Sequence, residues 1–494
     1  MKLNLLVMMA LSSVLAYGGI PSTNVSQPDY SDLISGSRRI LSLPENACVL
    51  PLSDVEVHVK KPVLARSCSK PFRAETTGYG QLKAILDANG GAGIDSLTVA
   101  GPMDISDFKT IWDCAVYGNL TCLNLGEASI KDNDIPDRAL YDPIQWDQGF
   151  LLKIKKIILP EDVERIGVAA LALMALEEIN MPSKLRAIES SVFLFDRYLN
   201  CPLVFPEGLE EIRYQAFHDC FSLSTTPILP GTLKKIGVHA FSGTQIEGIE
   251  FPESLEEIME GAFVATSLTK VYLPDNCLKI GPMAFQGCHQ LKEVRLPKDL
   301  ERIPYGLFSQ CRNVDFQTIT LNEGCRVIGS NAFQSTFIKE INYNDKIECI
   351  EYEAFNGTNI EEVIIPESIK TLGWGCFSNT YTGIKSIYCQ SPTPPTCEIE
   401  EERTYTPFGS PGSLADINLF VPCGAKEAYS KAPCWRDFVN IIETNDFPGA
   451  SVWKPGTGDN TGSDTTPIYD LSGRQINNPQ HGEIYIRNGI KYIK

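Results

Sequence analysis

The sequence predicts an α/β solenoid: a right-handed superhelix with a parallel, concave β-sheet on one side and short helices or turns on the convex side. Three observations predict it. A phenylalanine-centred motif recurs at a nearly constant spacing, an alternating strand precedes most copies, and a proline ends most of these strands. Because a self-similar unit of about 20 to 50 residues is typical of stacked repeats, the period decides the fold class more firmly than the length does.

The anchor of each repeat is the last residue of a loose Ile-x-x-x-Ala-Phe pattern, and successive anchors lie 22 to 25 residues apart. Ten copies in phase are too regular for a chance periodicity, so one anchor is expected in each rung of the stack. The anchors are Leu171, Phe193, Phe217, Phe241, Phe263, Phe285, Phe308, Phe333, Phe355 and Phe377.

The strand half of a repeat alternates between apolar and polar residues, most clearly in residues 291–297. Successive side chains of a strand point to opposite faces, so Val294 is expected to face the core while Glu293 and Arg295 face outward. Proline ends the strand because it has no N–H to donate to a ladder. This slot holds Pro160, Pro182, Pro206, Pro230, Pro252, Pro274, Pro297 and Pro366, with Asn322 and Asn344 in two other repeats.

The second half of a repeat, such as residues 280–285, is predicted to be a turn or short helix that carries its Ile and Phe inward. One such unit buries too little apolar surface to fold alone. Stacked units share a continuous core, which makes the repeat region a single body.

The unit Leu-x-x-Val/Ile-x-Leu-Pro-x-x-Leu-x-x-Ile-Gly-x-x-Ala-Phe-x-x-Cys resembles the BspA-type leucine-rich repeat of surface proteins of Bacteroidetes. Residues 80–86 are similar to the short first helix of such proteins, and residues 419–441 are similar to their closing cap. The resemblance implies a leucine-rich repeat domain over residues 76–445 with a cap at each end. The segment at Cys201 and Pro202 departs from the pattern, because it places residues that form strands poorly where a strand is expected.

The sixteen cysteines have two explanations. Cys220, Cys288 and Cys311 each lie three residues after an anchor, in the Cys slot of the family, and are expected to be free thiols in the core. Other cysteines could close short loops as disulfides, although the pairing does not follow from sequence. The closest pairs are Cys114/Cys122, Cys389/Cys397 and Cys423/Cys434.

The N-terminus predicts export. Lys2 precedes a short apolar run, and residues 14–16 offer small side chains at the cleavage positions, so residues 1–16 are predicted to be a secretory signal peptide. The apolar run is too short to span a bilayer, and no later segment reaches the length of a transmembrane helix. We therefore expect a secreted or cell-surface protein that is soluble once the signal is removed.

The remaining segments differ in composition from the repeats. Residues 17–75 show no repeat and are treated as an N-terminal extension, and residues 446–467 are predicted to be a flexible linker. In residues 468–494, alternating strands flank turns at Ser472-Gly473 and Asn488-Gly489, which predicts a β tail of small hairpins. This tail resembles the sorting module that the type IX secretion machinery recognises; a purely structural β tag is the alternative.

Charge and motif content argue against several functions. The chain carries 43 Lys and Arg against 61 Asp and Glu, a net charge of −18, which does not suit the phosphates of nucleic acid. It has no metalloprotease, nucleophile-elbow, P-loop or dinucleotide motif, so no cofactor and no metal site are expected. His218 near Cys220, and His289 beside Cys288, could form nucleophile–base pairs. Both cysteines occupy the structural slot of the repeat, so no enzyme is expected.

The remaining candidate for a functional site is the outward face of the strands. Tyr and Arg are the usual anchors of protein interfaces, so Tyr272 and Arg295 in the central repeats are the first candidates for partner contact. The alternative is that a sheet face needs strand-forming residues whatever it binds. The other candidates are Glu250, Lys270, Glu293, Thr320, Asn342 and Tyr388.

The resemblance implies adhesion, because members of the family are linked to binding of host matrix proteins and to bacterial co-aggregation. We therefore expect a surface protein that binds a protein partner through its concave sheet. The alternative is a glycan-binding or scaffolding module of a surface complex. A mixed charged and aromatic face would favour protein, whereas aromatic side chains clustered at one end would favour glycan.

Overall fold

The computed structural model describes residues 71–398 and 406–448, together with the strand residues 468–470, 475–476, 484–487 and 490–493. The predicted signal peptide, most of the N-terminal extension and residues 449–467 of the predicted linker lie outside the described residues. The chain divides into two compact units, and the repeats belong to the unit formed by Lys70–Trp146 and Phe150–Lys494.

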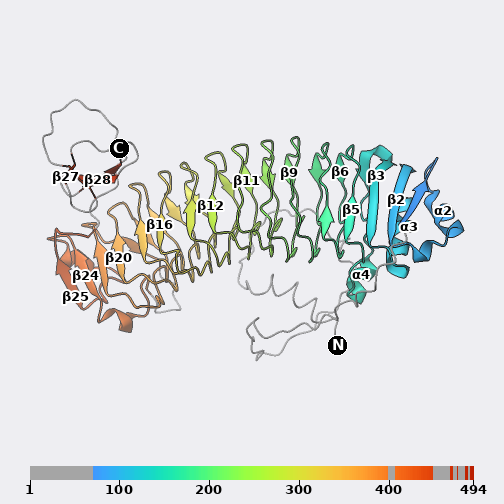
Figure 1. The fold of residues 1–494 in the computed structure, drawn as a ribbon. Helices are drawn as coiled ribbons and strands as arrows, with labels where there is room; N and C mark the ends of the chain where they lie inside the picture. The colour runs from blue at the N-terminus through green and yellow to red at the C-terminus, as the bar shows by residue number, and fades with distance from the viewer. Residues whose placement is uncertain are drawn as a thin grey trace. The chain divides into compact units, whose positions relative to one another are not determined.

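The repeats form a leucine-rich repeat solenoid of parallel strands, as the spacing predicts (Figure 1). The strand halves make a first ladder. Its strands are β1 (Pro71–Glu75), β2 (Ser96–Met103), β3 (Cys122–Ile130), β5 (Lys156–Ile158), β7 (Glu178–Ile179), β12 (Lys270–Tyr272), β14 (Glu293–Arg295), β16 (Thr318–Thr320), β18 (Glu340–Asn342), β20 (Glu362–Ile365), β22 (Ser386–Cys389), β24 (Asn418–Val421) and β25 (Asn440–Glu443).

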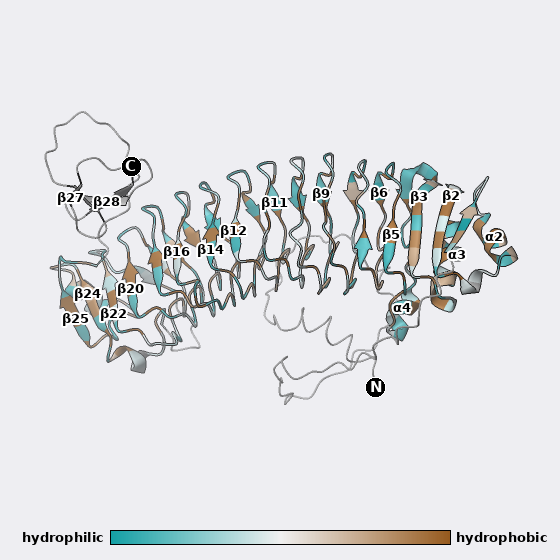
Figure 2. Cartoon of the chain, viewed as in Figure 1, coloured by the Kyte–Doolittle hydropathy of each residue, from teal (hydrophilic) through white to brown (hydrophobic). Residues whose placement is uncertain are grey.

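Parallel pairing aligns equivalent residues of neighbouring repeats. In β12 and β14, for example, Val271 pairs with Val294, and Tyr272 pairs with Arg295. Val271 is fully buried whereas Tyr272 is exposed, as the alternation predicts. Figure 2 shows the same alternation as brown and teal bands along β2 and β3.

The turn halves contain a second parallel ladder that the sequence pattern does not predict. Each of its strands has only two residues, too few to show a period of two, and each presents one apolar side chain to the core. The strands are β4 (Asp134–Ile135), β6 (Arg165–Ile166), β8 (Ala187–Ile188), β9 (Glu211–Ile212), β10 (Lys235–Ile236), β11 (Glu257–Ile258), β13 (Lys279–Ile280), β15 (Arg302–Ile303), β17 (Val327–Ile328), β19 (Cys349–Ile350), β21 (Thr371–Leu372) and β23 (Thr396–Cys397).

Of the two forms predicted for the convex side, turns and not short helices follow the second ladder over the described residues 149–398. The backbone explains why. In every repeat, two residues with positive φ bracket the anchor, two positions before and two after it, and such residues interrupt a right-handed helix. They are Ala169 and Leu173, Ser191 and Phe195, Gln215 and Asp219, His239 and Gly243, Gly261 and Ala265, Met283 and Gly287, Gly306 and Gln310, Asn331 and Ser335, Glu353 and Gly357, and Gly375 and Asn379.

The anchor rings form one continuous stack through the core. From Phe193 to Phe377 and on to Phe408, neighbouring ring centroids lie 4.9 to 6.2 Å apart and the planes differ by 2° to 19°. Leu171 occupies the same slot and is buried. Phe408 was not predicted as an anchor, because it lies 408 − 377 = 31 residues after the previous anchor, outside the repeat period.

The structure shows which of the described cysteines are free and which form disulfides. Every one of them is a free thiol in the structure, including the six in the three pairs that are close in sequence. Cys220, Cys288 and Cys311 are fully buried, as the repeat slot predicts. In the repeats anchored by Phe241, Phe263, Phe333 and Phe355, a threonine takes this slot and donates a hydrogen bond to the carbonyl of the anchor.

The N-terminal end of the stack carries the helices α2 (Leu82–Ala88), η3 (Gly91–Gly93) and α3 (Ile105–Tyr117). Two further helices, η4 (Lys131–Asn133) and α4 (Pro143–Gln148), flank β4, and α4 lies on the turn side, where Trp146 packs on Phe195 (Figure 1). The parallel sheet begins at β1, slightly before the predicted boundary at residue 76, because Ala74 alternates into the core. Asp107 of α3 is fully buried and accepts hydrogen bonds from the backbone N–H of Gly80, Leu82 and Asp104 at 2.9 to 3.0 Å, which ties α2 to α3.

The C-terminal end is closed by η5 (Pro411–Leu414) and α5 (Lys426–Lys431) with the residues that follow them. Trp435 is fully buried and packs 5.5 Å from the ring of Phe408, at the end of the stack. A separate antiparallel sheet lies further along the chain, in the order β27-β26-β28-β29. Its strands are β26 (Ile468–Asp470), β27 (Gln475–Ile476), β28 (Ile484–Arg487) and β29 (Ile490–Ile493).

The first ladder is not continuous. Among the described strands, pairing stops between β7 and β12, between β14 and β16, and between β18 and β20. Bonds on the turn side persist across the gap between β14 and β16: the Gly306 N–H donates to Ser330 (3.0 Å), and the Phe308 N–H donates to Ala332 (2.8 Å). The second ladder also pairs across it, through β15 and β17.

Candidate interaction surface

Four of the predicted site residues come together on β12 and β14. We call Lys270, Tyr272, Glu293 and Arg295 the central patch. Register places Lys270 opposite Glu293 and Tyr272 opposite Arg295. The Lys270 ammonium lies 3.5 Å from Glu293 and 5.7 Å from the centre of the Tyr272 ring, and the Arg295 guanidinium lies 5.9 Å from that centre.

The central patch is exposed and its charges are coupled. Tyr272 lies between two cations, an arrangement that favours both because the ring face is negative. The hydrogen bond between Tyr272 and Glu293 raises the pKa of the Tyr272 hydroxyl and lowers the pKa of the Glu293 carboxyl. These side chains therefore hold one another in an ordered arrangement before any partner binds, which reduces the entropy lost on binding.

Thr320 and Asn342 form a second group. They are paired in register on β16 and β18, and the Asn342 amide donates to the Thr320 hydroxyl at 3.1 Å. Both are exposed, but they belong to a different two-stranded sheet from the central patch. Glu250 is also exposed, in a repeat that has no first-ladder strand.

Tyr388 belongs to a third group at the C-terminal end. Its ring stacks on Phe420 of β24, with centroids 4.6 Å apart and planes 10° apart. Register continues this apolar row to Ile364 on one side and Ile442 on the other. Phe420 was not predicted, because its segment resembled a cap. A signal was present, since the apolar run 419–421 ends at Pro422, as the repeat strands end in proline.

The Cys220–His218 pair is not arranged for nucleophilic catalysis, and in the other pair Cys288 is fully buried whereas His289 is exposed. The Cys220 thiol is fully buried and donates to the Phe193 carbonyl at 3.1 Å, and burial raises its pKa. Burial also lowers the pKa of His218 to about 4, and the His218 ring lies 3.6 Å from the Asp219 carboxylate. The described residues contain no cluster of three or more metal-binding side chains.

The buried carboxyl group of Asp219 should make the stability of the protein depend on pH. Burial raises its pKa to about 6, against the opposing charge of Arg197. Below about pH 4 the carboxyl is protonated in both the folded and the unfolded chain, so ionisation costs nothing. As the pH rises through 6, the folded chain bears a cost of about 2 to 3 kcal/mol for the buried charge. The contribution of Asp219 to stability is therefore lost as the pH rises through this range.

We expect Asp219→Asn to be more stable than the unsubstituted chain at pH 7.5 by about 2 kcal/mol. At pH 4 the two should unfold alike. Asn tolerates the left-handed backbone at this position, so the substitution introduces no strain. Urea unfolding at both pH values measures the difference, with the exposed Asp299→Asn as the control. An equal difference at pH 4 and pH 7.5 would contradict the assignment.

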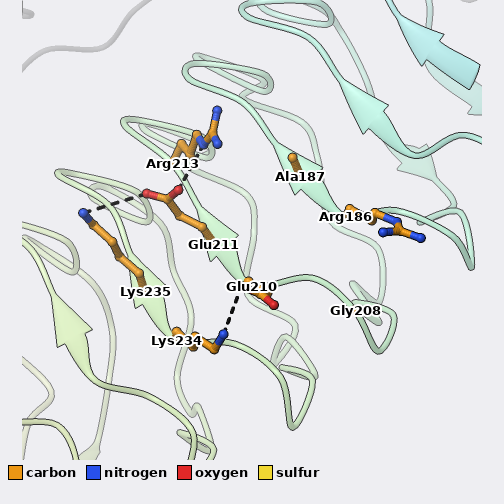
Figure 3. Close-up of a pocket in the computed structure, with 8 residues that line it drawn as sticks. All are labelled: Arg186, Ala187, Gly208, Glu210, Glu211, Arg213, Lys234 and Lys235. Carbon is orange, nitrogen blue, oxygen red and sulfur yellow. Dashed lines mark hydrogen bonds and ion pairs between the residues drawn. The ribbon is translucent and has the colours of Figure 1, made fainter. Parts of the chain in front are cut away.

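A shallow groove of about 450 Å³ lies over β8, β9 and β10 (Figure 3). Its cations already have carboxylate partners: Lys234 with Glu210 at 3.1 Å, and Arg213 with Glu211 at 3.1 Å. The ion pairs leave little uncompensated charge for a small ligand, so we assign no site here. The lining residues are Arg186, Ala187, Gly208, Glu210, Glu211, Arg213, Lys234 and Lys235.

The described helices are all too short, or too polar, to cross a lipid bilayer.

Comparison with solved structures returns leucine-rich repeat proteins. One, from Bacteroides ovatus ATCC 8483, is 21% identical over 61% of this chain, with a TM-score of 0.34, and the match spans 65% of that protein. A leucine rich cell surface protein from Faecalibacterium prausnitzii A2-165 is 20% identical over 63% of this chain and 83% of its own, with a TM-score of 0.37. The pneumococcal vaccine antigen PcpA is 20% identical over 65% and 87%, with a TM-score of 0.36. No curated protein matches this chain.

The family profile described as BspA type Leucine rich repeat region matches this chain in six copies, over residues 150–266, 210–315 and 256–385. These matches cover the rungs whose anchors, paired strands and bracketing left-handed residues are described above. The repeat region of this chain, residues 150–385, belongs to the BspA-type leucine-rich repeat family.

Proposed function

We propose that this chain is an exported, surface-exposed binding protein without catalytic activity, and that it captures a protein partner through the outward face of its first ladder. The observation that carries the proposal is the central patch. A tyrosine held between two cations, next to a carboxylate, combines apolar area with charge of both signs. Such a mixed face suits the polar and aromatic surface of a protein partner better than it suits a sugar.

The family supports a protein as the partner. A protein on the surface of another cell, or of the host matrix, would meet an exported solenoid along its length, and repeat proteins present extended surfaces for such contacts. A screen of the purified protein against immobilised matrix proteins and glycans would identify the partner. Binding to no matrix protein and to no bacterial surface protein would overturn the proposal.

The central patch should dominate the affinity for that partner. We expect Tyr272→Ala combined with Arg295→Ala to weaken binding by at least about tenfold, because both interface anchors are removed while the inward residues of β12 and β14 remain. Surface plasmon resonance gives the affinity, and circular dichroism checks the fold. The matched control is Tyr305→Ala with Arg312→Ala, which removes the same two residue types outside both ladders. Equal affinity of the two double variants would exclude the central patch.

Glycan binding is the second candidate, and the row of Ile364, Tyr388, Phe420 and Ile442 favours it. This row places aromatic side chains together at one end of the solenoid. Loss of glycan binding on Tyr388→Ala, with no effect of the Tyr272 and Arg295 substitutions, would move the site from the central patch to this end.

We further propose that the β tail is the sorting signal for type IX export. Its four strands form a sheet of their own, as expected of a module that export machinery could recognise separately. Deletion of residues 468–494 should leave the repeats folded but prevent surface display, measured by antibody labelling of intact cells. Normal display of the truncated chain would leave the tail a structural tag.

A further inference from the structure

The C-terminal cap places two cysteines together that are 37 residues apart in sequence (434 − 397). Cys397 lies on β23 and is in register with Leu372, so it continues the column of inward apolar residues in the second ladder. No strand follows β23 in this ladder among the described residues. The cap takes the place of the next rung, and Cys434 is part of that cap.

Two hydrogen bonds fix the cap against the segment that contains Cys397. The Trp435 indole N–H donates to the Pro395 carbonyl at 2.9 Å, and the Tyr429 hydroxyl donates to the Ser391 carbonyl at 2.8 Å. The first of these bonds joins the residue after Cys434 to a residue two positions before Cys397. Both donors are buried, so the approach of the two cysteines is built into the core of the cap.

The two thiols interact with one another: the pKa of the Cys434 thiol is lowered and the pKa of the Cys397 thiol is raised, each chiefly by the other thiol. The sulfur of Cys389, which is next nearest in sequence to Cys397, instead lies 3.0 Å from the Tyr429 hydroxyl oxygen. The geometry therefore selects the pair Cys397–Cys434 over Cys389–Cys397 and Cys423–Cys434, the two short loops that sequence spacing allows here.

We propose that Cys397 and Cys434 are the site of an oxidative cross-link, a disulfide that locks the cap onto the last strand of the second ladder. The oxidant is a disulfide, either a small molecule such as oxidised glutathione or the active-site disulfide of an oxidoreductase. The thiolate of Cys397, the partly exposed member of the pair, attacks one sulfur of that donor and releases the other as a thiol. The Cys434 thiolate then attacks the sulfur of Cys397 and releases the second thiol, so two electrons and two protons pass to the donor.

The core holds a second thiol pair that serves as an internal comparison. Cys288 and Cys311 occupy the same slot of adjacent repeats and also interact with one another, but both are fully buried. Burial raises the pKa of Cys311, and no donor can reach either sulfur without opening the stack. Cys397, by contrast, is partly exposed. The cross-link is therefore expected at the end of the solenoid and not in its core.

The main effect of the cross-link would be to oppose local unfolding at the C-terminal end of the solenoid. Each repeat contacts only its neighbours, so unfolding of a solenoid can start at an end and propagate. A disulfide between the cap and β23 closes the chain across this end and restricts its open states. This consequence does not depend on the partner or on the route of export.

Peptide mapping tests the proposal on the full-length protein. The protein is incubated with oxidised glutathione, denatured with N-ethylmaleimide present, digested and analysed by mass spectrometry. We expect the peptide of Cys397 linked to the peptide of Cys434, released by dithiothreitol, while Cys288 and Cys311 carry the maleimide. Full alkylation of Cys397 and Cys434 after oxidation, or linkage of either to Cys389 or Cys423, would overturn the proposal.

Limited proteolysis gives a second readout. Oxidation should slow thermolysin cleavage within residues 406–448 by at least about tenfold, since a restraint of about 1.4 kcal/mol on local opening already gives that factor. Cys397→Ser and Cys434→Ser should each abolish both the linked peptide and this protection. The unsubstituted protein, reduced and oxidised, provides the same comparison if either variant folds poorly, and equal cleavage of its two forms would count against a lock on the cap.

Discussion

Replacing Phe285 by Ala should lower the free energy of unfolding by about 3 to 5 kcal/mol. Phe285 is fully buried, and its ring lies 5.4 Å from Phe263 and 5.8 Å from Phe308, in the middle of the ring stack. Removing it leaves a cavity that the neighbouring rings cannot fill, because each is held by its own repeat. The loss should be local, so the flanking repeats should exchange amide protons faster than those near either cap.

Urea unfolding and hydrogen exchange measure these effects. Phe221→Ala is the control, because Phe221 is 45% exposed and makes only a cation–π contact with Arg197; it should cost less than about 1 kcal/mol. Phe285→Leu should fall between the two, since it keeps part of the buried volume. A cost for Phe285→Ala as small as that for Phe221→Ala would mean that the ring stack contributes little to stability.

Asp107→Ala should cost about 3 kcal/mol or more at the N-terminal end. The buried carboxylate accepts from three backbone N–H groups, and each buried donor left without an acceptor costs about 1 to 3 kcal/mol. The substitution also removes the capping box of α3. Exchange protection should fall in α2, α3, β1 and β2, because these elements depend on the tie, while the central repeats stay protected.

The comparison for this prediction is Asp87→Ala on α2. Asp87 is exposed and paired only with Lys83, and such surface ion pairs contribute at most about 1 kcal/mol. Asp107→Asn keeps one acceptor oxygen and should be intermediate. If Asp107→Ala loosened the whole chain equally, the solenoid would be more cooperative than nearest-neighbour stacking allows.

The fold was predictable because one residue type recurs in one slot. Nine of the ten anchors are Phe, and the ring stack follows once the repeats stack in register. The second ladder was not predictable, since a pair such as Lys279–Ile280 is too short to show alternation. The left-handed residues were not predictable either, because positions such as Met283 and Gln310 carry no glycine to mark them.

The candidate site was predictable in position but not in chemistry. Counting back from the proline slot places Tyr272 and Arg295 on one face, and register then makes them neighbours. The contact of Lys270 with both Tyr272 and Glu293 depends on side-chain conformation, which no spacing specifies. Contacts across long sequence separations, such as Phe420 on Tyr388 and Cys434 on Cys397, depend on how the cap folds back, and the repeat period carries no information about it.

The gaps in the first ladder give the outward face a segmented construction. The central patch, the Thr320–Asn342 pair and the Tyr388 row lie on three separate sheets. At the boundary between the sheets of the central patch and of the Thr320–Asn342 pair, β15 still pairs with β17 and the turns remain hydrogen-bonded. Bending at this boundary would separate the strands of the first ladder and leave the turn side bonded. The outward face is thus divided into separate short sheets over one continuous core. A surface divided in this way can adjust to the contour of a curved or irregular partner at the boundaries between its sheets.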